Sequence, residues 1–208
     1  MSSAIPAVVL AAGRGRRLGD VAKATLETRS GETFLAAIQA CAHLAGVDRA
    51  VVVIGPPHDA RSGAEAARLC WPTVRNPHPE RGMASSVELG FAHVCATWPD
   101  APAALLWPVD HARVTAPSVR RVIAACRPDG AVIPTYRGRG GHPAGFGREL
   151  WPALTRCQAL PHGARSVLHS LRHKTPERVT RIELDDVGLI ADIDTPGDAR
   201  RAHPVDSR

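Results

Sequence analysis

The sequence AVVLAAGRGRRLG, residues 7–19, decides the architecture that we expect for this chain. Its first part, residues 7–12, is a continuous apolar run, which is typical of a strand covered on both faces in a parallel sheet. The three glycines of residues 13–19 let backbone N–H groups approach an anion closely, and the three arginines between them add positive charge. The segment therefore predicts a strand that leads directly into an anion-binding loop.

Two common nucleotide-binding templates do not fit this loop. The dinucleotide fingerprint G-x-G-x-x-G would need glycine in place of Leu18, and the P-loop would need lysine in place of Asp20. Lys23 lies just downstream and is one of only two lysines among the 26 basic residues. A compact ammonium suits a single phosphate oxygen, so Lys23 favours a phosphate-binding role over an ordinary turn with surface arginines.

Beyond the loop, apolar runs alternate with segments of helical periodicity. Residues 136–147 are rich in glycine, and we expect no regular element there. Strands separated by helices predict an α/β protein with a doubly wound, mainly parallel sheet in one domain, residues 1–202, followed by a frayed tail at 203–208. The further strands are expected at 50–54, 103–109, 131–134 and 178–184, and the helices at 33–45, 58–69, 83–96, 117–126, 163–173 and 196–202.

The composition of the 208 residues excludes several classes of protein. Hydrophobic residues make up 44% of the chain and aromatic residues only 4%, so its core must be built mainly from aliphatic side chains. No apolar run approaches the length of about 18 residues that a membrane span needs. The N-terminal apolar run precedes its charges, the reverse of a secretory signal, so we expect a cytoplasmic protein with no membrane partner.

Cysteine spacing and charge distribution exclude two further kinds of site. The five cysteines are odd in number and far apart, with no C-x-x-C pair, which favours buried free thiols over disulfides or a zinc site. The net charge is +6, but the arginines are spread along the chain without interleaved aromatic residues. We therefore expect no nucleic-acid partner, because a nucleotide explains a local basic cluster equally well.

A second motif, NPHPERGMASS at residues 76–86, leads into the expected helix at 83–96. Free N–H groups at a helix start favour an anion or a carbonyl oxygen, and Gly82 permits close approach of a ligand. The alternative is an ordinary helix N-terminus with local caps.

Acidic residues mark a candidate metal site. Asp110 ends an apolar strand, where burial of an unpaired charge is unfavourable, so it needs a salt bridge, a cap or a divalent cation. Near the C-terminus, Asp192 and Asp194 lie on the same side of an extended chain. Mg²⁺ is typically held by one or two carboxylates together with phosphate oxygens and water.

The remaining candidate motif is the basic, glycine-rich stretch at 136–147, in which His142 precedes Pro143. A solvated hairpin is the alternative interpretation. His169 and His173 share a helix face, but the glutamate of an H-E-x-x-H zinc motif is missing, so we expect no metal site there.

These motifs resemble those of the MobA-like nucleotidyltransferases, and most of all the molybdenum cofactor cytidylyltransferases. The sequence departs from the usual family pattern at several positions: Gly15 replaces serine, Leu18 replaces methionine, Ala112 replaces proline, and residues 25–27 (Thr-Leu-Glu) replace Leu-Leu-Pro. Lys23 lies four residues after Gly19, a spacing more like that of the guanylyl branch. The matching segments are LAAGRGRRLG at 10–19, NPHPERGMASS at 76–86, GRGGHP at 138–143 and DIDTPGD at 192–198.

The resemblance implies a Rossmann-like nucleotide-diphospho-sugar transferase fold and a Mg²⁺-dependent nucleotidyl transfer. A nucleoside monophosphate, preferably CMP from CTP, would move to a phosphorylated acceptor with release of pyrophosphate. CTP is preferred because the related guanylyl branch usually has L-A-G-G where residues 10–13 are L-A-A-G. Molybdopterin is the implied acceptor, and a molybdoenzyme is the implied recipient of the product.

The resemblance also implies a role for individual residues. Catalysis would involve Arg17, Lys23 and Asp110. Mg²⁺ would be held by Asp110 and Asp194, and the acceptor would be bound by Gly141, His142 and Pro143. The implied nucleotide-binding residues are Leu10, Ala11, Ala12, Gly13, Gly15, Arg17, Lys23, Asn76, Gly82, Met83 and Ser86.

Other functions remain open at this point. An enzyme of the same fold could use GTP, or could act on a sugar phosphate or an alcohol phosphate, and pyrophosphate release across substrates separates these cases. A non-catalytic nucleotide-binding module in cofactor maturation would bind CTP without forming a product. A basic nucleic-acid-binding domain would show strongly salt-dependent affinity for DNA or RNA.

Overall fold

The computed structural model describes residues 5–28 and 30–191, except for the side chain of Arg17. The expected helix at 196–202 and tail at 203–208 lie outside the described residues. Among the residues described, no helix has the length and apolar character needed to cross a bilayer.

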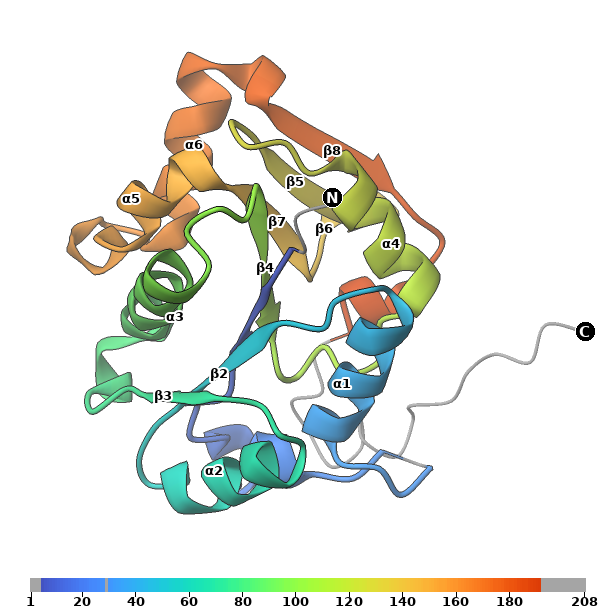
Figure 1. Cartoon of the computed structure of the whole chain (residues 1–208), viewed down its shortest axis with the longest axis vertical. Helices are drawn as coiled ribbons and strands as arrows, with labels where there is room; N and C mark the ends of the chain where they lie inside the picture. Colours follow the sequence, from blue (N-terminus) through green and yellow to red (C-terminus); the bar gives the residue numbers. More distant parts are fainter. Residues whose placement is uncertain (1–4, 29, 192–208) are drawn as a thin grey trace, which may run out of the picture.

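A single mixed sheet of eight strands runs through the molecule (Figure 1). The strand order is β3-β2-β1-β4-β7-β5-β6, and β8 pairs with β5. The first four strands are parallel to one another, β7 is antiparallel to both β4 and β5, and β8 is parallel to β5. The strands are β1 (Ala7–Leu10), β2 (Ala50–Ile54), β3 (Thr73–Arg75), β4 (Ala103–Pro108), β5 (Ala131–Tyr136), β6 (Arg139–Gly140), β7 (Ala144–Gly147) and β8 (Val179–Glu183).

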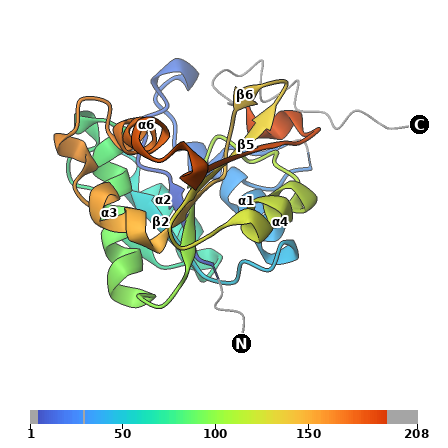
Figure 2. The same cartoon turned by 90° about the horizontal axis from the view of Figure 1, so that it is seen from above.

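Helices cover both faces of this sheet, as Figure 2 shows from above. On one face α1, α2 and α4 contribute buried apolar side chains, and on the other face α3, α5 and α6 do so. The doubly wound, mainly parallel α/β fold expected from the sequence is therefore confirmed. The helices are α1 (Phe34–Leu44), α2 (Asp59–Arg68), α3 (Met83–Thr97), α4 (Ala116–Ala125), α5 (Trp151–Leu154) and α6 (Ala164–Lys174).

The two faces of β1 explain why its sequence is apolar without alternation. Side chains alternate across a strand, so Ala7 and Val9 enter the core under α1 and α4, whereas Val8 and Leu10 enter the core under α3. All four are at most 7% exposed. A polar residue at any of these positions would lose water without gaining a partner, so both layers of the fold require this run.

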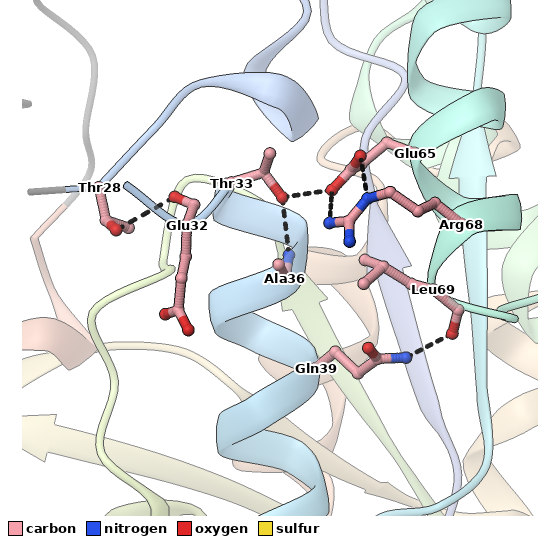
Figure 3. Close-up of polar contacts among 8 residues, drawn as sticks. All are labelled: Thr28, Glu32, Thr33, Ala36, Gln39, Glu65, Arg68 and Leu69. Carbon is pink, nitrogen blue, oxygen red and sulfur yellow. Dashed lines mark hydrogen bonds and ion pairs between the residues drawn. The ribbon is translucent and has the colours of Figure 1, made fainter. Parts of the chain in front are cut away.

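A polar network ties the start of α1 to α2 (Figure 3). Thr33 is the N-cap of α1: its Oγ1 accepts a hydrogen bond from the Ala36 amide at 3.1 Å and donates one to the Glu65 carboxylate. Arg68 holds the same carboxylate through Nε and Nη2, at 3.0 and 2.7 Å. The short helical turn η2 (Lys23–Thr25) packs against both helices, so this network supports the segment that carries Lys23.

The expectation that residues 136–147 form no regular element is wrong. They contain the end of β5, all of β6 and all of β7. The glycines that suggested a loop serve close packing instead: a Cβ on Gly145 would lie 2.5 Å from Cys126 Sγ, and one on Gly147 would lie 2.3 Å from the Arg127 carbonyl oxygen. Strands β6 and β7 thus lie in the sheet although their sequences lack the apolar pattern that would predict a strand.

The cysteine expectation needs one correction. All five cysteines are free, Cys157 is buried, and three others are partly buried. Cys70, however, is exposed; it follows the C-terminal end of α2 and has a left-handed φ of 56°. Burial raises the pKa of the Cys41 and Cys126 thiols to about 12, so both are protonated at neutral pH.

Candidate nucleotide-binding site

A pocket of about 350 Å³ opens at the carboxyl ends of β1 and β4. Ligands of open α/β sheets bind at this edge, because the loops that leave the strands converge there. Loop, strand and helix segments that are far apart in the sequence meet in its wall. The lining residues are Leu10, Ala12, Gly13, Gly15, Arg16, Lys23, Pro79, Gly82, Met83, Ser86, Pro108, Val109 and Asp110.

The glycine loop has a conformation that its sequence requires. Gly15 has a left-handed φ of 61°, and a Cβ at this position would lie 2.5 Å from the carbonyl oxygen of Val21. The Gly15 carbonyl accepts hydrogen bonds from the amides of Leu18 and Asp20, which folds the loop back on itself. Arg14 then holds the Asp20 carboxylate through Nε and Nη2, at 3.3 and 3.0 Å.

The two charged groups nearest the expected phosphates pair with each other. Lys23 Nζ lies 2.9 Å from Asp110 Oδ2, and the two side chains are 14% and 23% exposed. The other carboxylate oxygen of Asp110 has no hydrogen-bond partner among the residues that the structure describes. The pair places one ammonium and one carboxylate within reach of the same ligand.

The start of α3 forms the wall facing the loop. Gly82 is the N-cap of α3 with φ 94°, and a glycine has no side chain with which to cap the helix. Met83 is 61% exposed although it lines the pocket, so its side chain is available to cover a ligand. Free amides at the start of a 15-residue helix provide donors for a polar ligand.

Asn76 supports this wall from behind. It is 1% exposed, and its amide Nδ2 donates to the hydroxyls of both Ser85 and Ser86, each at 2.9 Å. Its Oδ1 accepts a hydrogen bond from the backbone amide of His78 at 2.9 Å. The side chain of Asn76 is therefore committed within the protein.

Two histidines lie beside Asp110 but outside the lining of the pocket. The rings of His111 and His142 are 4.9 Å apart, and His142 Nδ1 lies 3.3 Å from the Leu106 carbonyl oxygen. Burial, and then the nearby His111, lower the pKa of His142 to about 4, so its imidazole is neutral at pH 7. A neutral ring offers one donor and one acceptor to a ligand.

The structure brings most of the expected nucleotide-binding residues together. Ala11 is buried in the core under α1 instead, because it points to the opposite face of the chain from Ala12. The acceptor candidates Gly141, His142 and Pro143 do not line the pocket, and Asp194, like Asp192, lies outside the described residues. The expected residues that line the pocket are Leu10, Ala12, Gly13, Gly15, Lys23, Gly82, Met83, Ser86 and Asp110.

Four lining residues were not among those expected from the sequence. Arg16 belongs to the same basic loop as Arg17, and its charge was the available signal. The expected residue Arg17 lies next to Arg16 in the 3-10 turn Arg16–Leu18. Pro79, Pro108 and Val109 line the pocket only with apolar surface, for which the sequence carried no signal.

No cluster of three or more metal-ligating side chains is present within residues 5–28 and 30–191. Asp110 is the acidic residue of the pocket lining. A carboxylate with one oxygen that no described residue bonds fits a Mg²⁺ ion that takes its other ligands from phosphate oxygens and water.

The fold and this pocket define a nucleotide-binding α/β protein with a basic glycine loop. The chain belongs to the MobA-like NTP transferase domain family, whose model matches residues 7–176. No curated protein sequence matches the chain. Family membership makes the protein a nucleotidyltransferase.

Solved structures of similar proteins have the same overall fold. The structure of Rv0371c from Mycobacterium tuberculosis H37Rv is 29% identical, covers 97% of this chain and 98% of that one, and has a TM-score of 0.78. A second structure, a complex of Rv0371c with manganese, is 26% identical over 96% and 97% of the two chains, with a TM-score of 0.74.

Two more distant structures share the fold alone. Molybdopterin-guanine dinucleotide biosynthesis protein A from Archaeoglobus fulgidus is 17% identical with a TM-score of 0.67, covering 95% of this chain and 96% of that one. The 4-diphosphocytidyl-2C-methyl-D-erythritolsynthase from Anaerococcus prevotii is 16% identical with a TM-score of 0.75, covering 97% and 95%. The nucleotide-diphospho-sugar transferase type of fold expected from the sequence is therefore confirmed.

Proposed function

We propose that this protein transfers CMP from CTP to a phosphorylated small molecule, with molybdopterin as the preferred acceptor, and releases pyrophosphate. The observation that carries the proposal is the convergence of the glycine loop, Lys23 and Asp110 in one pocket with the start of α3. These elements supply what a nucleoside triphosphate needs: donors for phosphate oxygens, a counter-charge and a less polar wall for the base.

The triphosphate lies against the glycine loop in this proposal. Backbone amides at Gly13 and Gly15 donate to phosphate oxygens, and Arg16 and Lys23 neutralise their charge. Because the β- and γ-phosphates leave as pyrophosphate, the same charges stabilise the leaving group. Arg17 is proposed to assist from the same turn.

Asp110 would hold Mg²⁺, with Asp194 as the proposed second carboxylate. When bound, the ion would neutralise charge on the α-phosphate and the acceptor phosphate. The manganese bound by the similar Rv0371c supports use of a divalent cation. The contribution of this chain is to keep Asp110 at the end of β4, within reach of Lys23.

The reaction requires little covalent participation by the protein. An oxygen of the acceptor phosphate attacks the α-phosphorus in line, the bond to the α,β-bridging oxygen breaks, and pyrophosphate departs. A phosphate acceptor is already anionic at neutral pH, so the step needs no general base. Positioning and neutralisation of charge therefore supply most of the rate enhancement.

The preference for CTP rests on the loop sequence and on the room that the pocket leaves for the base. Ala12 lines the pocket where the guanylyl branch of the resemblance has glycine, and its methyl group leaves less room for a purine. The acceptor is proposed to enter from the side of Gly141, His142 and Pro143, beside Asp110. The neutral imidazole of His142 would hydrogen-bond the pterin or its phosphate.

The decisive test measures pyrophosphate release. Purified protein with Mg²⁺ is given CTP, GTP, UTP or ATP, each with molybdenum cofactor, 2-C-methyl-D-erythritol 4-phosphate or a hexose 1-phosphate. The proposal expects release only with CTP and molybdenum cofactor. Release with another nucleotide and acceptor would show that the protein is an enzyme of the same fold with different substrates. CTP binding without release would show a non-catalytic module.

A further inference from the structure

The hydroxyl of Ser86 has its hydrogen-bonding polarity fixed by the residue behind it. The Asn76 Oδ1 atom faces the backbone amide of His78, which can only donate, so Asn76 must present its Nδ2 to the two serines. The Oγ of Ser86 therefore accepts a hydrogen bond from Asn76. Its own proton is left to be donated elsewhere.

The hydroxyls of Ser85 and Ser86 both accept a hydrogen bond from the Asn76 amide, but they differ in where their own protons are donated. The Ser85 hydroxyl donates back into the turn, to the Gly82 carbonyl oxygen at 2.8 Å or the His78 carbonyl oxygen at 3.3 Å. The Ser86 hydroxyl has no acceptor among the residues that the structure describes, although the residue is only 5% exposed. Ser86 lines the pocket and Ser85 does not, so the available proton faces the ligand space.

The surroundings of Ser86 suit a nucleobase. The lining residues that share its wall are Pro79, Gly82 and Met83, none of which carries a formal charge. The charged lining residues belong to the glycine loop, to η2 and to the end of β4. A triphosphate held at the charged side directs its base toward Ser86.

We propose that Asn76 is a positioning residue that fixes Ser86 as a hydrogen-bond donor toward N3 of cytosine, and that this polarity makes the pocket selective for CTP. Cytosine N3 is an acceptor, whereas uracil presents N3–H and guanine presents N1–H at the equivalent edge. A donor facing another donor leaves both groups unsatisfied, which weakens binding of the wrong base. This inference rests on the proposed function.

Reversing the polarity tests the inference more sharply than deleting the hydroxyl does. In Asn76→Asp, the carboxylate still accepts from His78 but now also accepts from both serine hydroxyls. Ser86 then presents lone pairs to the pocket and should favour uracil. Ser86→Ala removes the donor, and since it deletes only one atom it remains informative if Asn76→Asp fails to fold.

The experiment is direct calorimetric binding of CTP, UTP and GTP with Mg²⁺ and no acceptor. We expect Ser86→Ala to weaken CTP binding about tenfold, the equivalent of one hydrogen bond, and to change UTP and GTP binding less than about twofold. Asn76→Asp should lower the ratio of CTP to UTP affinity by about tenfold or more. Ser85→Ala is the matched control, and it should leave that ratio unchanged.

Three results would overturn the inference. Equal loss of CTP and UTP affinity in Ser86→Ala would show that the hydroxyl does not read N3. An unchanged affinity ratio in folded Asn76→Asp would show that polarity does not set selectivity. If the wild-type protein binds no triphosphate, the proposed function fails and the inference fails with it, whereas normal binding with unmoved ratios removes the inference alone.

Discussion

Lys23 Nζ lies 2.9 Å from Oδ2 of Asp110, joining the segment after the glycine loop to the end of β4 across 87 positions of sequence. Both side chains are largely sheltered from water, at 14% and 23% exposure. A charge pair in this setting holds its partners in place, and loss of one partner leaves the other poorly compensated. The two residues form the electrostatic centre of the pocket.

The first prediction concerns Lys23. Replacement by methionine keeps the length of the side chain but removes its charge, so stabilisation of the leaving pyrophosphate is lost. We expect turnover to fall by about a hundredfold or more, the typical effect of one well-placed charge donor. Lys174→Met, at the end of α6, is the matched control and should retain wild-type turnover. A near-normal rate in Lys23→Met would remove Lys23 from the mechanism.

The second prediction concerns Asp110. Asp110→Asn removes the carboxylate charge that would hold the cation, so Mn²⁺ binding in the presence of CTP should weaken by about tenfold or more, alongside a loss of turnover. Electron paramagnetic resonance of free Mn²⁺ measures the binding directly. Asp48→Asn, on an exposed residue paired with His43, controls for a general loss of surface charge. Unchanged Mn²⁺ affinity in Asp110→Asn would exclude it as a metal ligand.

The third prediction concerns the loop position at which the family pattern usually has serine. Because φ of Gly15 is 61° and a Cβ would lie 2.5 Å from the Val21 carbonyl oxygen, Gly15→Ser must deform the loop. We expect CTP affinity to fall by about tenfold or more in a calorimetric titration. Gly46→Ala, with φ 84° but nothing near its Cβ, imposes only the backbone strain, and it should bind CTP normally. Tighter binding by Gly15→Ser would show that the loop adapts.

The fourth prediction follows from the lowered pKa of His142. The unfolded chain binds a proton below its ordinary pKa of about 6.5, whereas the folded protein binds it only near pH 4, so acid favours unfolding across this window. Between pH 7 and pH 5 the imidazole should reduce the free energy of unfolding by on the order of 2 kcal/mol. His142→Gln should lose that part of the pH dependence in urea-unfolding curves. Identical pH slopes in the two proteins would contradict the assigned burial of His142.

The fifth prediction concerns stability away from the pocket. Ser62 in α2 is fully buried, and within residues 5–28 and 30–191 its Oγ has no hydrogen-bond partner. Since a buried hydroxyl without a partner is unfavourable, Ser62→Ala should raise the free energy of unfolding by about 1 kcal/mol. Ser118→Ala, which removes a hydroxyl 3.1 Å from Thr115 Oγ1, should lower it instead. Destabilisation by Ser62→Ala of the same size as by Ser118→Ala would show that the hydroxyl has a partner.

Segments with strong periodicity could be predicted from the sequence because burial on a defined face leaves a pattern. The apolar run that ends at Leu10 marks β1, and Phe34, Leu35 and Ile38 mark α1. Strand β3 (Thr73–Arg75) escaped prediction because it is short and largely exposed at the edge of the sheet. Strand β7 escaped because its glycines are required by neighbouring backbone and sulfur atoms, which only the tertiary structure reveals.

The residues of the candidate site likewise divide into those that the sequence indicates and those that only the tertiary structure reveals. The glycines of residues 13–19, Lys23 and Asp110 are unusual residue types at their positions, so the sequence alone indicated them as candidates. The contribution of Asn76 could not be read correctly, because its amide faces serines nine and ten positions later, behind the pocket wall. The pairing of Lys23 with Asp110 depends on β1 and β4 lying side by side, which is a property of the strand order.

The most direct test of the account is a crystal structure with Mg²⁺ and a non-hydrolysable α,β-methylene analogue of CTP. The account predicts that the triphosphate contacts residues 13–16 and Lys23, that the metal ion is bound by Asp110 and Asp194, and that the cytosine lies against Ser86. An analogue bound elsewhere, or Asp110 and Asp194 on opposite sides of the molecule, would contradict it.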